Sequence, residues 1–304
     1  MRQVIYEERA VSSSNNSTSK MESWHVVLLL AWAWVGNQSK GTNLNDTRAR
    51  RVLGNRATSC PCGSSNKGRV LGGIQALPNE YPWVASLVRN KGLIPVCGAS
   101  IITQWVAITA AHCIANKEPS SLFAGTSDLS KSGILIPLKS YSIYNWNPGM
   151  TGGRNDISLL FLAHSITFSA IISPICLPTK KLNLNKKWVK LIGWGKLGYQ
   201  KPGSKNLMEA DVQVLPFNEC KKYHGLQLPE TQVCVRTPGK GGCFGDSGGP
   251  VVWLDPETNK YTLVGLVSFG SPRCDTKIPT VNTDVSAFIS WIKNTIHTAG
   301  CHKV

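Results

Sequence analysis

The chain has 304 residues, of which 42% are hydrophobic, and this is enough for a sizeable core in one or two domains. Its ten cysteines indicate a disulfide-bonded globular protein of an oxidising compartment. The net charge of +16 predicts either attraction to acidic glycans or membranes or simply a solvated basic surface. No nucleic-acid-binding module is recognisable, so nucleic acid is excluded as an expected partner.

Residues 1–35 are predicted to be a leader. The largely apolar run over residues 24–35 is too short for a comfortable membrane span and has the size of the hydrophobic region of a signal peptide. The polar lead before it is long, so Met21 rather than Met1 is a candidate start of an ordinary signal peptide. A signal anchor is the alternative. We expect a secreted, extracellular protein.

Residues 36–69 are predicted to be a pro-segment. Asn37 and Asn45 begin N-x-S/T sequons, which are candidate glycosylation sites on an exposed secreted stretch. Cys60 and Cys62 follow without the partner spacing of a zinc site, so disulfides are favoured. No other metal site or cofactor is expected, since residues 125–132 carry one acid and calcium requires several oxygen ligands.

From Pro82 onward, short β-branched and aromatic runs alternate with Gly, Pro, Asn and Ser. Residues 251–254 and 261–267 flank a turn and predict a hairpin. Many short strands at this spacing favour an all-β sandwich or barrel. Residues 285–296 predict one amphipathic helix with Val285, Phe288, Ile289, Ile292 and Ile296 on one side.

Three stretches contain the residue types of nucleophilic catalysis. His112 follows an apolar, strand-like run, Asp156 precedes another, and Ser247 lies among glycines in residues 241–250. A serine hydroxyl needs a base to become nucleophilic, and a glycine turn with free N–H groups suits an oxyanion. Alone, each stretch fits a packed histidine, a turn carboxylate or a glycine-rich turn. Together, in this order, they favour a His–Asp–Ser triad.

With Val70-Leu71-Gly72-Gly73 behind Arg69, these motifs make the chain similar to the chymotrypsin/trypsin family of serine endopeptidases, over roughly residues 62–296. The resemblance implies an all-β fold of two six-stranded antiparallel Greek-key barrels and a C-terminal helix. The protease domain would span 70–304, with barrels at about 70–172 and 188–284.

The resemblance also implies the role of each site residue. Ser247 would attack the scissile carbonyl, His112 would accept and return the proton, and Asp156 would orient the imidazole. The backbone N–H groups of Gly245 and Ser247 would form the oxyanion hole. A non-catalytic, protease-like binding protein and a membrane-tethered protease are the alternatives.

The specificity pocket is expected to lack a negatively charged residue at its bottom. Trypsin-like members have an aspartate six residues before the serine, where this chain has Gly241, so a buried Arg or Lys side chain would find no counter-charge. Thr280 replaces a wall glycine and should narrow the pocket. Apolar P1 residues of medium size are therefore predicted, with Phe and Tyr accepted if Thr280 turns aside. Asp275 is the residue that would favour basic P1 instead. The expected substrate-binding residues are Gly241, Gly242, Phe244, Ser268, Phe269, Gly270 and Thr280.

Activation is expected by cleavage between Arg69 and Val70. The new N-terminus would then be Val70-Leu71, where the family usually has isoleucine followed by valine. The freed amine would pair with the buried carboxylate of Asp246. Because the pocket should reject arginine, the expected partners are a separate trypsin-like activating protease, polypeptide substrates, and a serpin-type or other protein inhibitor.

By resemblance, the expected disulfides are Cys62–Cys176, Cys97–Cys113, Cys220–Cys234 and Cys243–Cys274. The first would keep the pro-segment attached after cleavage. Cys60 and Cys301 are left over, and the sequence leaves open a bond between them, free thiols or intermolecular pairing.

Overall fold

The computed structural model describes residues 61–66, 74–89, 94–115, 118–148, 153–224 and 228–296, which all belong to one compact unit of the chain. The leader, both sequons, the Arg69–Val70 bond, Cys60 and Cys301 lie outside these residues. The elements in chain order are β1 (Ile74–Gln75), β2 (Val84–Arg89), β3 (Ile94–Ile101), β4 (Val106–Thr109), α1 (Ala111–Ala115), β5 (Ser121–Ala124), β6 (Ile134–Ile143), β7 (Ser158–Leu162), β8 (Trp188–Gly193), β9 (Met208–Val214), α2 (Phe217–His224), β10 (Gln232–Arg236), β11 (Pro250–Asp255), β12 (Lys260–Phe269), β13 (Thr280–Asp284), the 3-10 turn η1 (Val285–Phe288) and α3 (Ile289–Ile296).

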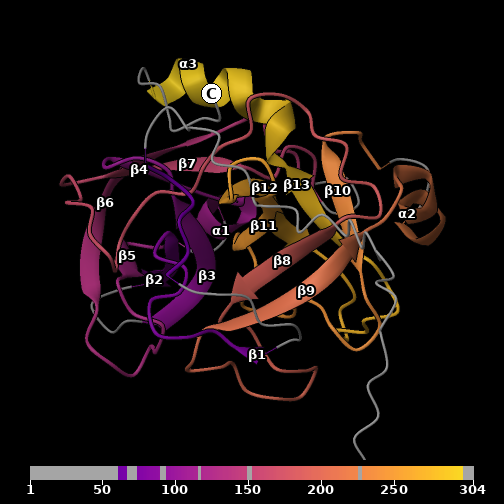
Figure 1. Cartoon of the computed structure of the whole chain (residues 1–304), viewed down its shortest axis with the longest axis horizontal. Coiled ribbons are helices and arrows are strands. Elements are labelled where there is room, and N and C mark those ends of the chain that lie inside the picture. The colour runs from indigo at the N-terminus through magenta and orange to yellow at the C-terminus, as the bar shows by residue number, and fades with distance from the viewer. Residues whose placement is uncertain are drawn as a thin grey trace, which may run out of the picture. The chain divides into compact units, whose positions relative to one another are not determined.

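Two antiparallel barrels make up most of the structure (Figure 1). The first closes in the order β2-β3-β4-β7-β6-β5. The second runs β9-β10-β13-β12-β11-β8 and closes through the β8–β9 pairing, while the short β1 pairs with β9 outside it. The predicted fold of two six-stranded barrels is therefore confirmed, as is the hairpin, whose strands are β11 and β12.

Each barrel buries its own alternating apolar side chains, and a third cluster joins them. In the first barrel Leu87 and Leu160 are fully buried, and in the second Val212 and Val251 are fully buried. The joining cluster combines Trp83 and Ile108 of the first barrel with Ile192, Leu263 and Leu266 of the second. Burial at roughly 25 cal/mol per Å² makes such a cluster the main force that holds two barrels together.

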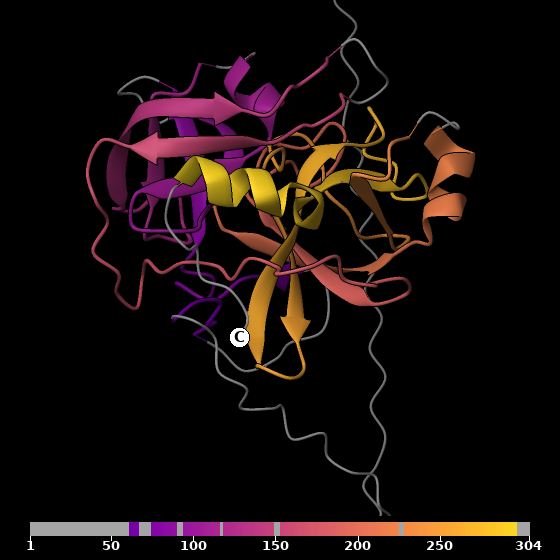
Figure 2. The same cartoon turned by 90° about the horizontal axis from the view of Figure 1, so that it is seen from above.

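The C-terminal helix begins with a tighter turn than the sequence predicts. Asp284 is its N-cap and accepts a hydrogen bond from Ser286 N, after which η1 leads into α3. The rings of Phe288 and Trp291 contact Tyr144 at centroid distances of 5.4 and 5.3 Å, so the helix also packs on the segment after β6 (Figure 2). None of the helices in the described ranges has the length and apolar character of a membrane span.

The structure contains the disulfides Cys62–Cys176, Cys97–Cys113, Cys220–Cys234 and Cys243–Cys274, which are the four pairs that the resemblance implies. The stretch around Cys62 is part of the body rather than a loose tail. Gly63 N donates to Pro174 O, and the Asn66 side chain donates to Asn79 O and Ala170 O. Residues 61–66, which precede the expected cleavage bond, are therefore fixed by covalent and non-covalent contacts.

Candidate active site

Asp156 lies just before β7, where the left-handed backbone of Asn155 (φ 56°) turns the chain. Its side chain is buried, with 2% of the residue exposed, and it accepts three hydrogen bonds. Oδ1 accepts from His112 N at 2.9 Å, and Oδ2 lies 2.7 Å from His112 Nδ1 and 2.6 Å from Ser268 Oγ. Thr283 Oγ1 also donates to the backbone carbonyl of Asp156 at 2.7 Å, so groups from both barrels fix this residue.

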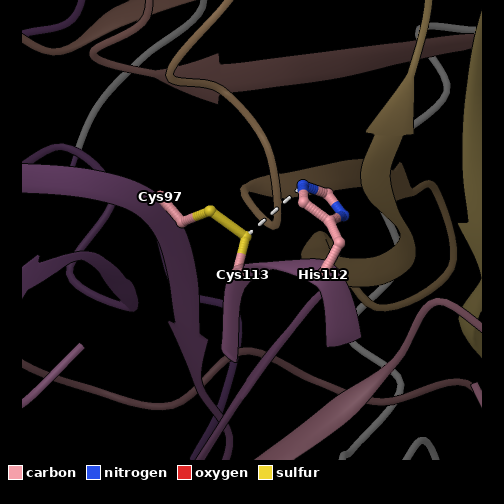
Figure 3. A group of neighbouring side chains, drawn as sticks. All are labelled: Cys97, His112 and Cys113. Carbon is pink, nitrogen blue, oxygen red and sulfur yellow. Dashed lines mark hydrogen bonds between the residues drawn. A yellow bond between two sulfur atoms is a disulfide. The ribbon is translucent and has the colours of Figure 1, made fainter. Parts of the chain in front are cut away.

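His112 lies on α1, directly after β4, with 19% of its side chain exposed. Because an ionised carboxylate only accepts hydrogen bonds, the contact with Asp156 places the ring proton on Nδ1 and leaves a lone pair on Nε2. Nε2 lies 3.7 Å from Cys113 Sγ (Figure 3). Cys97, His112 and Cys113 are close enough to hold a metal, but the disulfide occupies both sulfurs, so neither can act as a thiolate ligand.

Ser247 lies on a turn of the second barrel that is pressed against the first. Ser247 O accepts a hydrogen bond from Gly98 N at 2.8 Å. A Cβ on Gly248 (φ +72°) would stand 2.1 Å from Thr109 Oγ1, so only glycine allows this approach. The serine is thus fixed against the strand that precedes His112. Within the described ranges, Ser247 Oγ makes no hydrogen bond.

The backbone beside the serine presents free donors. Gly245 has a φ of 101°, and the preceding carbonyl, Phe244 O, accepts from Lys196 N at 2.8 Å. Because the C=O and N–H of a trans peptide point in opposite directions, Gly245 N–H is turned away from Lys196. Neither this group nor Ser247 N–H donates a hydrogen bond in the part of the chain that the structure describes.

A family model described as Trypsin matches residues 70–292. The chain belongs to the trypsin family. It is thus a serine endopeptidase by membership, and its fold of two antiparallel barrels is that of this family.

The chain is also similar to several curated proteins, two of which are named as serine proteases. It is 31% identical over 254 residues to a venom serine protease of Polistes dominula, covering 80% of this chain and 91% of that protein. It is 32% identical over 248 residues to venom serine protease 34 of Apis mellifera, covering 78% of this chain and 60% of that protein. It is 28% identical over 291 residues to the clotting factor G beta subunit of Tachypleus tridentatus, covering 89% and 92%.

Three of the residues predicted to bind substrate in this trypsin-family chain lie together. Gly241, Gly242 and Thr280 line one small cavity of about 10 Å³, and Asp275 is also in its lining. A Cβ on Gly270 would lie 3.5 Å from Thr280 Oγ1, so this threonine faces the opposite wall closely. Asp275 is exposed, and its Oδ1 accepts from Lys277 N at 2.9 Å. Asp275 therefore stabilises its own turn and is not a buried charge at the bottom of the pocket.

Two aromatic residues predicted to bind substrate occupy different surroundings. Phe244 is 51% exposed, with Lys196 Nζ above its ring at 5.7 Å. Phe269 is partly buried and packs edge-on against the ring of His224 at 5.5 Å. Phe244 is therefore accessible at the surface, whereas Phe269 is packed against α2.

Asp246 lies beside the serine and faces a cavity of about 240 Å³. Burial raises the pKa of Asp246 to about 6, although backbone hydrogen bonds from Cys243 N and Gly195 N, both at 2.9 Å, act in the opposite direction. A Cβ on Gly195 would stand 2.4 Å from this carboxylate, so glycine is required there. Among the described residues, no cation pairs with Asp246.

Sequence reasoning missed the residues that support the site. It assigned Ser268 to substrate binding but did not foresee its hydroxyl contact with Asp156, nor the contacts of Gly98, Thr109 and Thr283. The glycine beside Cys97 was the one local signal, since glycine inside a strand often marks close backbone approach. The hydroxyl contacts of Ser268 and Thr283 join residues more than 100 positions apart and leave no local pattern.

Proposed function

We propose that the chain is a secreted zymogen which, once cleaved after Arg69, hydrolyses peptide bonds with His112, Asp156 and Ser247. The observation that carries the proposal is the buried carboxylate of Asp156, which holds the imidazole with its Nε2 lone pair free. Ser247 Oγ attacks the scissile carbonyl while Nε2 takes its proton. The same proton then goes to the leaving amine, and water repeats the sequence on the acyl-enzyme.

The free N–H groups of Gly245 and Ser247 suit the oxyanion that forms during attack. One such donor contributes roughly 2.7–4 kcal/mol to the stability of the transition state. Proton transfer by the histidine contributes a further ~10²–10⁴-fold in rate. In the activated enzyme the backbone would hold these donors in place, so little reorganisation would accompany the reaction.

Activation follows from the partly buried carboxylate of Asp246. Cleavage after Arg69 frees the α-amine of Val70, and we infer that this ammonium enters the 240 Å³ cavity and pairs with Asp246. A buried carboxylate and a buried ammonium are each costly alone, which links the cleavage to the conformation of the Gly245–Ser247 turn.

A fluorophosphonate probe tests the proposal. We expect it to label the chain at Ser247 after cleavage at Arg69 and to leave a Ser247→Ala variant unlabelled. Failure to label a folded, cleaved sample would instead support the non-catalytic binding protein. The mass of the secreted form decides between a removed signal peptide and a retained anchor.

Thr280 should set the size of the P1 side chain. In a Thr280→Gly variant we expect kcat/KM for a Phe P1 peptide to rise at least tenfold relative to a Val P1 peptide, since a few methylene-sized contacts are worth about 1–3 kcal/mol. A P1 series with Ala, Val, Leu, Phe and Arg measures this. An unchanged ratio would show that Thr280 does not bound the pocket.

The same P1 peptide series tests the prediction that the pocket has no negatively charged residue at its bottom. We expect an Arg P1 peptide to be a poor substrate and the purified zymogen to remain uncleaved at Arg69 without a second protease. Self-cleavage there, or a preference for Arg that Asp275→Asn abolishes, would show that Asp275 supplies the counter-charge.

A further inference from the structure

Helix α2 is packed against the strands that lead to the specificity pocket. The disulfide Cys220–Cys234 holds the helix on β10 (Figure 1). Cys220 also belongs to a small apolar cluster with residues of β10 and β13, and Phe269 of β12 packs against this cluster. The predicted pocket residue Gly270 directly follows β12, and Thr280 begins β13. The helix therefore supports the two segments that carry these pocket residues.

His224, the last residue of α2, is half-buried and contacts both segments. Its Nε2 lies 2.9 Å from Pro279 O. Because a carbonyl oxygen only accepts hydrogen bonds, Nε2 carries the ring proton and donates it to Pro279 O. The ring of His224 also meets the ring of Phe269 edge-on, at a centroid distance of 5.5 Å. The end of the helix is thus linked to two separate segments of the second barrel.

Each of these contacts is made to the residue directly before a predicted wall of the pocket. Phe269 precedes Gly270, and Pro279 precedes Thr280, which lines the small pocket cavity. A Cβ on Gly270 would lie 3.5 Å from Thr280 Oγ1, so the two walls face each other closely. His224 does not line the cavity. It therefore touches both walls from outside the pocket.

The hydrogen bond to Pro279 O satisfies a backbone acceptor of a buried residue. A buried carbonyl that loses its donor is destabilised, so without the imidazole this segment would shift towards water or another donor. Thr280 is the next residue and would move with it. The position of this pocket wall therefore depends on a side chain that the substrate does not reach.

We propose that His224 is a positioning residue, which sets the width of the P1 pocket and thereby the selectivity for the P1 side chain. The inference rests on the proposed catalytic function and adds to it a determinant outside the pocket. A Leu P1 side chain needs both walls in place, whereas an Ala P1 side chain reaches only the mouth of the pocket. When the walls hold their binding position in only a fraction of the molecules, the affinity for the larger side chain falls by that fraction.

The test compares variants of the full-length enzyme, cleaved after Arg69, with Leu P1 and Ala P1 peptides. His224→Phe keeps a ring beside Phe269 but removes the donor. We expect it to lower the ratio of kcat/KM for Leu P1 to that for Ala P1 about tenfold, the order of effect of an unpaired buried carbonyl. His224→Gln has its Nε2 three bonds from Cβ, as histidine has, and should recover most of the ratio. His164→Phe makes the same chemical change at an exposed position after β7 and should leave the ratio unchanged.

A second measurement separates positioning from a loss of fold. A small fluorophosphonate without a P1 side chain reacts with Ser247 but does not use the pocket walls, so it should label the wild type and His224→Phe at the same rate. An unchanged ratio in His224→Phe would overturn the proposal. So would an equal fall of the ratio in His224→Gln, or a labelling rate that falls by the same factor as the ratio. A wild-type enzyme that cleaves neither peptide and is not labelled would contradict the proposed catalytic function and, with it, this inference.

Discussion

We expect an Asp156→Asn variant to hydrolyse a good peptide substrate with a kcat about 10⁴-fold below that of the wild type, the size of effect that this change has in a Ser–His–Asp triad. The structure explains why the amide cannot substitute. His112 N–H donates to Oδ1, so the carbonyl oxygen of the asparagine must take that place. Its NH₂ group then faces Nδ1, which forces the ring proton onto Nε2.

In that tautomer, Nε2 cannot accept the proton of Ser247, although the serine and the oxyanion donors are intact. The measurement is kcat and KM after cleavage at Arg69. Asp255→Asn is a matched control, because Asp255 is also buried but lies at the far end of β11. It should lower stability and leave kcat near the wild-type value. A loss of activity that only tracks a loss of folded protein in both variants would contradict the role given to Asp156.

The second large effect concerns Asp246. We expect Asp246→Asn to lower kcat/KM of the cleaved enzyme by about 10³-fold, because an unpaired buried ammonium costs about 3–5 kcal/mol and the amine of Val70 would then stay outside its cavity. The remaining activity should not increase on longer treatment with the activating protease. An Asp246→Asn enzyme with full activity would show that the amine pairs elsewhere.

The same carboxylate predicts a pH dependence before cleavage. Its pKa of about 6 lies above the ordinary value of 3.8, so the folded chain holds this proton more tightly than the unfolded chain. Stability therefore falls as the pH rises from about 4 to about 6, by an amount on the order of 3 kcal/mol. In an uncleavable Arg69→Gln background, Asp246→Asn should match the parent near pH 4 and unfold at a higher temperature above pH 6. In the cleaved enzyme, where the ammonium pairs with Asp246, the order of stability at pH 7 should reverse.

The parts that the sequence alone could determine are those written in local patterns. Alternating short strands indicated an all-β fold, the spacing of Val285 to Ile296 indicated the final helix, and the turn at residues 255–259 indicated the β11–β12 hairpin. The glycines around Ser247 and the order of the three motifs pointed to the triad because each motif is contiguous. The helix α2 was missed, since its eight residues carry few apolar side chains and its buried face is essentially Cys220.

Only the tertiary structure decided how distant groups meet. Ser268 and Thr283 reach Asp156 across 112 and 127 residues, and Gly98 meets the Ser247 turn, because closure of two barrels brings their edges together. The environment of Asp246, and with it the raised pKa, depends on burial by segments that no local pattern connects. A sequence pattern indicates which face of a segment is apolar. Which residue packs against that face is decided only when the barrels close.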